Sequence, residues 1–213
     1  MPRPRCSRCK RPASHCLCAL IPDLPSHTEV LVLQHPDEVD HALNTAHLAV
    51  LGLRNATLWV GEVFAALPGW LAQPGYRTCL LFPGEQARSV AAFGSDGDGR
   101  PVRLVVPDGT WRKARKLLYL NPALADLPRV TLADAPPSRY RLRKAPMEGS
   151  LSTLEAIVAA LNLLEAPADY AALLKPFDAL IEGQIAAMGE DTFRRNHLPL
   201  SLIHISEPTR RRG

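Results

Sequence analysis

The sequence predicts an α/β fold in which a mostly parallel sheet is flanked by helices. Short apolar runs, each of a length suited to a buried strand, recur along the chain. They alternate with segments whose apolar residues have helical spacing, and this alternation is typical of parallel sheets. The 213 residues, 46% of them hydrophobic, are enough to enclose one good-sized core.

The predicted elements alternate in order along the chain. Buried strands are predicted at residues 30–33, 56–60, 78–82 and 102–106, with a further strand at 129–132. Helices are predicted at residues 41–53, 110–119, 152–164 and 169–188. A glycine- and aspartate-rich loop is predicted within residues 93–101, and a polar loop is expected through Gly149. Ligands bind beyond the carboxyl ends of parallel strands, so the loop that follows residues 102–106 is the expected site.

The two ends of the chain differ in composition from the middle. Residues 1–25 are rich in Cys, Pro and Arg and are expected to form a small knuckle before a main domain of residues 26–197. Residues 200–213 resemble the translation of a sequencing adapter and are expected to be an artefact, so the fold prediction leaves them out. Their three arginines and one glutamate supply half of the formal net charge of +4, so bulk charge says little about the partner.

The hydrophobic pattern argues against a membrane protein. The longest apolar stretches are far too short to cross a bilayer. The amino terminus is basic but is followed by cysteines rather than by an apolar run, so no secretory signal is expected. A cytoplasmic location is therefore expected.

Four cysteines, Cys6, Cys9, Cys16 and Cys18, lie close together near the amino terminus. In a cytosolic protein this grouping indicates a metal site before it indicates disulfides, and four thiolates suit tetrahedral zinc. A redox role or an iron–sulfur cluster is the alternative. Basic residues surround the cysteines, so a small knuckle that contacts RNA is a further expectation.

The tetrapeptide Asp108-Gly109-Thr110-Trp111 lies where a predicted strand meets the following helix. A structural role explains two of its residues, because Gly109 permits a tight turn and Thr110 can cap the helix. That role does not explain why an acidic residue and a bulky aromatic residue flank them at the carboxyl end of a strand.

At this tetrapeptide the sequence resembles the DTW-domain family, which includes tRNA-uridine aminocarboxypropyltransferases. The other matching blocks, in the family's order, are His35-Pro36-x-Glu38 with Asn44-Thr45 and Leu48, Leu81-Phe-Pro-Gly-Glu85, Ser138-Arg139-Tyr140-x-Leu142-Arg143, and Ser152-Thr153-x-Glu155-Ala156. With the cysteines they cover most of the chain. One departure lies in the early block, where His41 replaces a usually basic residue and is only partly charged near neutral pH.

The resemblance implies a fold related to the SPOUT methyltransferases, in which the chain forms a knot around the cofactor site. It also implies S-adenosylmethionine as the donor and tRNA as the partner. The implied reaction transfers an aminocarboxypropyl group to the ring nitrogen N3 of a uridine and leaves methylthioadenosine. Many SPOUT relatives are dimers, so monomer and homodimer both remain open.

The resemblance and the chemistry together assign roles. Asp108 is expected to accept or orient the N3 proton of uridine, and Trp111 to stack on uracil or on the adenine of the donor. The residues expected to bind the cofactor are Pro107, Gly109, Thr110, Ser152, Thr153 and Glu155. Ser152 and Glu155 also have the spacing of a capping box at a helix start, and this role is compatible with cofactor binding.

Two basic clusters belong to the same family blocks. The residues expected to contact RNA are Arg112, Lys113, Arg115, Lys116, Arg139, Tyr140 and Arg143. Phosphate contacts from these residues would position tRNA without reading its sequence. The alternative is a solvated helix face and a solvated loop.

Two other functions compete with the aminocarboxypropyl transfer. A SPOUT-like RNA methyltransferase would use the same donor but would release S-adenosylhomocysteine. A non-catalytic zinc-knuckle RNA-binding protein would need only the cysteines and the basic clusters, and Asp108→Asn would leave its function intact.

Overall fold

The computed structural model describes residues 4–41, 43–132, 137–142 and 151–197. Its centre is a six-stranded sheet with the order β2-β1-β5-β3-β6-β4, and every neighbouring pair is parallel. The strands are β1 (Glu29–Gln34), β2 (Ala56–Val60), β3 (Arg77–Leu81), β4 (Arg88–Ser89), β5 (Val102–Asp108) and β6 (Arg129–Thr131). The predicted α/β class is confirmed, whereas the knot stays a prediction.

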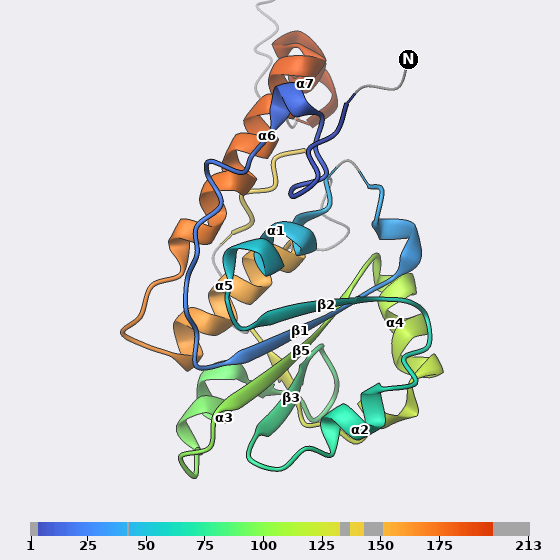
Figure 1. The fold of residues 1–213 in the computed structure, drawn as a ribbon, viewed down its shortest axis with the longest axis vertical. Helices are drawn as coiled ribbons and strands as arrows, with labels where there is room; N and C mark the ends of the chain where they lie inside the picture. The colour runs from blue at the N-terminus through green and yellow to red at the C-terminus, as the bar shows by residue number, and fades with distance from the viewer. Residues whose placement is uncertain (1–3, 42, 133–136, 143–150, 198–213) are drawn as a thin grey trace, which may run out of the picture.

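Helices cover both faces of the sheet (Figure 1). One face carries α1 (Thr45–Gly52), α3 (Val90–Ser95), α5 (Thr153–Leu164) and α6 (Lys175–Met188). The other face carries α2 (Leu67–Leu71) and α4 (Trp111–Leu120). Helix α7 (Glu190–His197) follows α6, and short 3-10 turns lie at Ala13–His15, Pro36–Glu38, Pro122–Leu124 and Ala171–Leu174.

Strand β1 shows why the predicted strands are continuous apolar runs. Successive side chains of a strand point to opposite faces, so both faces must be apolar when helices cover both. Val30 and Val32 belong to the core cluster under α1 and α5, whereas Leu31 and Leu33 belong to the cluster under α2 and α4. All four side chains are at most 1% exposed.

Several predicted boundaries were wrong for identifiable reasons. The helix expected from residue 41 begins at Thr45, because the Asn44 side chain accepts a hydrogen bond from the His47 N–H and caps it. Helix α3 extends to Ser95, into the segment predicted as a loop. The last long helix is divided into a 3-10 turn and α6, and α6 has Pro176 in its first turn.

The cysteine-rich segment packs against the α/β core and lies beside α6 (Figure 1). Cys9 is 2% exposed and Leu17 is 7% exposed, and both belong to the core cluster of the α5 face. In the described part of the chain, none of the helices combines the length and the apolar character that crossing a bilayer requires. The expected artefact at residues 200–213 lies outside the described residues.

Candidate active site

Asp108 is the last residue of β5 and lies at the carboxyl edge of the sheet. Its side chain is 8% exposed. In the parallel register its partner on β1 is Gln34, which is 1% exposed. The Gln34 Nε2 group donates a hydrogen bond of 2.7 Å to Asp108 Oδ2, so the sheet register itself sets this contact.

The amino terminus of α5 supplies a second contact to the same carboxylate. The Thr153 hydroxyl donates a hydrogen bond of 2.5 Å to Asp108 Oδ1. Each carboxylate oxygen thus has a donor from a different element, which orients the group. Thr153 was predicted in the cofactor site, and the structure places it directly against Asp108.

Glu155 and Ser152 form the predicted capping box. The Ser152 side chain accepts from the Glu155 N–H, and the Glu155 carboxylate accepts from the Ser152 N–H at 2.8 Å. The Glu155 carboxylate, 6% exposed, also accepts from the Ser138 hydroxyl at 2.9 Å and from the Arg139 N–H at 2.6 Å. Glu155 therefore ties the 137–142 segment to the start of α5.

Gly109 allows the chain to turn closely past the site. Its φ of +149° is one that residues with side chains rarely adopt. A Cβ at this position would lie 3.0 Å from the Cβ of Lys113 and 3.7 Å from that of His35. Thr110 then caps α4, because its side chain accepts a hydrogen bond from the Lys113 N–H.

A cavity of about 300 Å³ opens beside Asp108. The predicted residues that line it are Asp108, Gly109, Thr110, Tyr140, Ser152 and Thr153. Its other lining residues include Asn44 and His41, and neither was assigned to the site from the sequence. Gln34, the partner of Asp108, was also missed, and its only sequence signal is its place at the end of a strand before the His35 block.

Three of the residues predicted to act in catalysis or to bind the cofactor lie outside this cavity. Pro107 lies within β5 opposite Leu33, and Glu155 lies behind the capping box. The Trp111 ring packs edge-on against Phe82, with ring centroids 5.6 Å apart. The predicted stacking role of Trp111 on a base thus stays a prediction.

A second cavity, of about 430 Å³, extends along α5 from the ends of β4 and β6. Its walls are mainly apolar and include Leu132, Leu151 and Val158. Arg139 and Glu155 lie at its polar side. The start of α5 and the 137–142 segment line both cavities. An elongated ligand that occupied both would place an apolar part in the cavity along α5 and a polar part beside Asp108.

The predicted RNA-contacting residues differ in their surroundings. Lys113 forms an ion pair of 2.8 Å with Glu38, and this hydrogen bond raises the pKa of the lysine. Lys116 pairs with Glu62 at 2.8 Å, and the Arg139 guanidinium pairs with Asp178 at 3.0 Å. Arg112 and Arg115 are exposed on α4, Tyr140 packs edge-on against Phe177, and Arg143 lies outside the described residues.

The four amino-terminal cysteines converge as predicted. Their sulfur atoms all lie within 4.8 Å of one another, with Cys6 and Cys18 3.5 Å apart and Cys9 and Cys16 3.7 Å apart. Tetrahedral zinc with Zn–S bonds of about 2.3 Å requires sulfur atoms roughly 3.8 Å apart, so the cluster fits zinc. Backbone N–H groups of Cys9 and Arg8 lower the pKa of Cys6 to about 6, whereas burial and the neighbouring thiols raise the pKa of Cys18 to about 12.

The fold and this site define an α/β protein whose polar centre is a buried carboxylate at the carboxyl edge of a parallel sheet. Comparison with known sequences identifies the family. Residues 3–185 match the DTW domain, and the chain belongs to the DTW domain family.

Similar proteins of this family have been named. The chain is 32% identical to "tRNA-uridine aminocarboxypropyltransferase 2" of Macaca fascicularis, over 92% of this chain and 68% of the relative. It is 34% identical to the protein of the same name from Drosophila melanogaster, over 86% and 76%. It is 31% identical to "tRNA-uridine aminocarboxypropyltransferase A" of Arabidopsis thaliana, over 75% and 72%. No solved structure matches the chain significantly.

Proposed function

We propose that this protein is an enzyme that transfers the 3-amino-3-carboxypropyl group of S-adenosylmethionine to N3 of a uridine in tRNA. Family membership and the names of the similar proteins support this reaction class. The observation that carries the proposal is Asp108, a buried carboxylate of the family's own motif, oriented by two donors beside a polar cavity.

The uridine N3 carries a proton and is a poor nucleophile until that proton leaves. Asp108 accepts or orients this proton as N3 attacks the terminal carbon of the aminocarboxypropyl chain. The new N–C bond forms as the C–S bond breaks, and sulfur leaves as methylthioadenosine. Gln34 and Thr153 hold the carboxylate in place, because each donates to one of its oxygens.

Bound S-adenosylmethionine supplies an electrophilic carbon next to a cationic sulfur. The residues present fit such a donor. The apolar cavity along α5 suits its adenosine part, and backbone N–H groups at the start of α5 suit its carboxylate. Ser152 holds Glu155 in the capping box, so we assign its hydroxyl to positioning rather than to the donor.

The basic residues support RNA binding from outside the reaction centre. Arg112 and Arg115 are exposed on α4, the helix that begins at Trp111, and suit phosphate contacts. We further propose that the four cysteines hold one zinc ion in a structural site, because four protein ligands leave no open position for chemistry. A reducing cytoplasm would keep these thiols available for the metal.

The test is to incubate the purified protein with S-adenosylmethionine and unmodified tRNA, then to analyse nucleosides and spent donor together by mass spectrometry. Aminocarboxypropyl-uridine with an equal amount of methylthioadenosine is the expected result. A methylated nucleoside with S-adenosylhomocysteine would overturn the proposal in favour of a methyltransferase. Tight tRNA binding without any product would favour a binding protein instead.

A further inference from the structure

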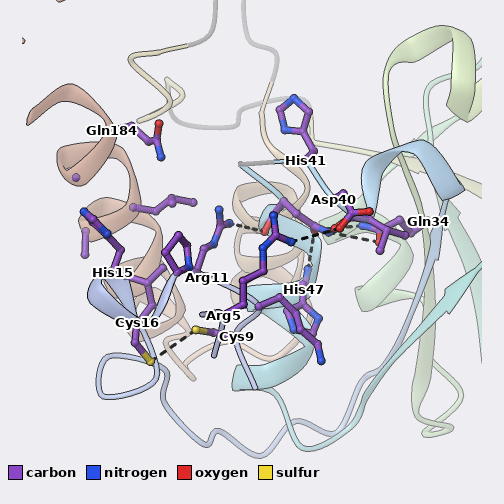
Figure 2. Close-up of a pocket in the computed structure, with 18 of the residues that line it drawn as sticks. Arg5, Cys9, Arg11, His15, Cys16, Gln34, Asp40, His41, His47 and Gln184 are labelled. Carbon is purple, nitrogen blue, oxygen red and sulfur yellow. Dashed lines mark hydrogen bonds and ion pairs between the residues drawn. The ribbon is translucent and has the colours of Figure 1, made fainter. Parts of the chain in front are cut away.

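A third and larger cavity, of about 590 Å³, lies between the cysteine-rich segment, the ends of β1 and β2, and α6 (Figure 2). Its apolar walls include Leu58 and Val60 of β2 and Leu180 of α6. This volume is within the range of cavities that bind small organic molecules. None of the functional assignments above uses this cavity.

The charge of the cavity is mainly positive. Arg5, Lys10 and Arg11 line it, against a single carboxylate, Asp40, and three histidines add further N–H donors. Figure 2 shows Arg5 and Arg11 between Gln184 of α6 on one side and Gln34 of β1 on the other.

Two of these cations, Lys10 and Arg11, have no carboxylate partner among the described residues. In the described residues no carboxylate lies within ion-pair distance of Lys10 or Arg11, and the Arg11 guanidinium donates only to the Asn44 carbonyl, at 3.3 Å. Lys113 on α4, in contrast, is paired with Glu38. Arg11 is partly buried, and a partly buried cation without a carboxylate partner favours an anionic ligand. Lys10 is exposed and adds positive charge beside it.

The cavity is connected to the reaction centre by shared residues. Asn44 and His41 line both this cavity and the one beside Asp108. Gln34 lines the larger cavity through the same side chain that donates to Asp108 at 2.7 Å. A ligand that fills the larger cavity therefore lies one side chain away from the carboxylate.

We propose that this cavity holds a nucleotide adjacent to the target uridine, from an unpaired part of the tRNA. Its base lies against the apolar wall of β2 and α6, and its phosphates contact Lys10 and Arg11. An apolar wall with a cationic rim suits a nucleotide, which has a flat base and a charged backbone. An unpaired segment is required, because bases within an RNA helix cannot be splayed into a pocket. This inference rests on the proposed function, since it places a neighbour of the uridine that the reaction modifies.

The first test fills the cavity with a side chain. Gly183 of α6 lines the cavity, and a Cβ there meets no atom within 4 Å, so Gly183→Phe has space to fold. Gly69 of α2 also has open space around its Cβ and lies on the other face of the sheet, which makes Gly69→Phe the matched control. We expect Gly183→Phe to weaken tRNA binding roughly tenfold or more and to leave S-adenosylmethionine affinity unchanged. Equal tRNA affinity of both variants would overturn the assignment.

The second test removes charge from the rim. Lys10→Gln with Arg11→Gln should weaken tRNA binding and make the slope of log K against log salt shallower by about 1.4. Arg8→Gln is the control, because Arg8 is on the same knuckle, is exposed and does not line the cavity. If the double variant binds tRNA normally but loses its bound zinc, Lys10 and Arg11 balance the charge of the cysteine thiolates and do not contact RNA. That result would overturn the proposal.

The two proposals fail in different ways. If the wild-type protein forms no aminocarboxypropyl-uridine, the proposed function is wrong whatever the variants bind. If the wild-type protein is active and both cavity variants bind and modify tRNA normally, only the assignment of this cavity to the neighbouring nucleotide is wrong.

Discussion

At the residue scale, Asp108 is a buried carboxylate whose position several elements of the fold determine. It is placed by β5, aligned by Gln34 from β1 and held by Thr153 from α5. Three elements that are distant in the sequence thus determine the position of one carboxylate. Preorganisation of this kind favours proton transfer, because the group does not have to reorient during the reaction.

We predict that Asp108→Asn lowers the rate of aminocarboxypropyl transfer roughly 10²- to 10⁴-fold, because an amide cannot accept the proton. The melting temperature and the tRNA affinity should stay close to those of the wild-type protein, since the variant keeps the shape of the side chain. Single-turnover kinetics with saturating donor measure the chemical step. A normal single-turnover rate would refute the assigned role.

At the element scale, helix α5 links the site to the rest of the fold through both of its ends. Its start holds Asp108 and the capping box. At its end Glu165 accepts hydrogen bonds from the Thr28 N–H at 2.7 Å, the His27 N–H at 3.1 Å and the Tyr170 hydroxyl at 2.5 Å. Glu165 thereby joins α5 to the chain that enters β1.

These contacts make part of the stability pH-dependent. Burial acts to raise the pKa of Glu165, but the hydrogen bonds from Tyr170, Thr28 and His27 outweigh it and lower the pKa. A carboxylate with a lowered folded-state pKa stabilises the fold above its unfolded pKa. That stability is lost as the pH falls through the folded-state pKa.

We predict that Glu165→Gln costs roughly 1 kcal/mol of unfolding free energy at pH 7, and that the difference from wild type disappears in acid. Urea unfolding at a series of pH values measures this. Glu182→Gln is the control, because Glu182 is exposed and its pair with Arg141 should contribute little. A difference that persisted unchanged at pH 3 would show that the carboxylate charge is not the cause.

Strand β5 has a buried cation near its other end. The Arg103 side chain is 1% exposed and lies between the rings of Trp70 and Tyr76, with its guanidinium carbon 3.8 and 3.9 Å from their centroids. It also pairs with Glu29 of β1 at 2.7 Å. Arg103 lies near the amino-terminal end of β5, whereas Asp108 lies at its carboxyl end. Arg103 therefore stabilises the fold and is not part of the site.

We predict that Arg103→Met lowers the unfolding free energy by about 3 kcal/mol, because it leaves Glu29 without its partner. The double variant with Glu29→Met should recover part of that loss. Chemical denaturation of both variants and of Glu29→Met completes the cycle. Additive losses in the double variant would mean that the ion pair itself has little effect.

At the scale of the whole molecule, three cavities follow the carboxyl edge of the sheet. The largest lies at the ends of β1 and β2, the cavity of Asp108 lies between β1 and β5, and the apolar one lies at the ends of β4 and β6. In the proposed assignment the RNA and the donor approach Asp108 from opposite sides.

We predict that the cysteine cluster stabilises the wall of the largest cavity. Removal of metal by a chelator should lower the melting temperature by roughly 5 °C, which corresponds to about 2 kcal/mol for a chain of this size, and should weaken tRNA binding. Far-UV circular dichroism should retain the α/β signal. The variant Cys6→Ser should show no further decrease with chelator, and a full additional decrease would place the metal elsewhere.

The fold was predictable where local patterns determine structure. The central strands β1 and β5 are buried apolar runs as predicted, whereas β2, also predicted as buried, is an edge strand with no fully buried residue. The Ser152–Glu155 spacing predicted the start of α5 within one residue. Helix α2 and strand β4 were missed, because five and two residues are too short for a periodic signal. The strand order, with β5 between β1 and β3, depends on pairing between distant segments and has no local signal.

The site was predictable in part for the same reason. Motifs and a family resemblance singled out Asp108 and Thr153, which line one cavity, and the four cysteines, whose sulfur atoms cluster. Gln34 was not found, because a glutamine at a strand end has no meaning until the register places it opposite Asp108. Lys10 and Arg11 likewise acquire significance only when the fold brings them beside α6.

The register between Gln34 and Asp108 also makes it possible to move the catalytic carboxylate by a known distance. The two residues face each other on adjacent strands, so exchanging them, as Gln34→Asp with Asp108→Gln, would move the carboxylate sideways by one strand spacing, about 4.8 Å. The exchanged protein would keep the same composition, charge and backbone. The rate that remains would show how far the proton acceptor can lie from its natural position before the transfer fails. The fixed spacing of two paired strands makes this displacement known in advance, whereas the displacement of a residue on a loop is not.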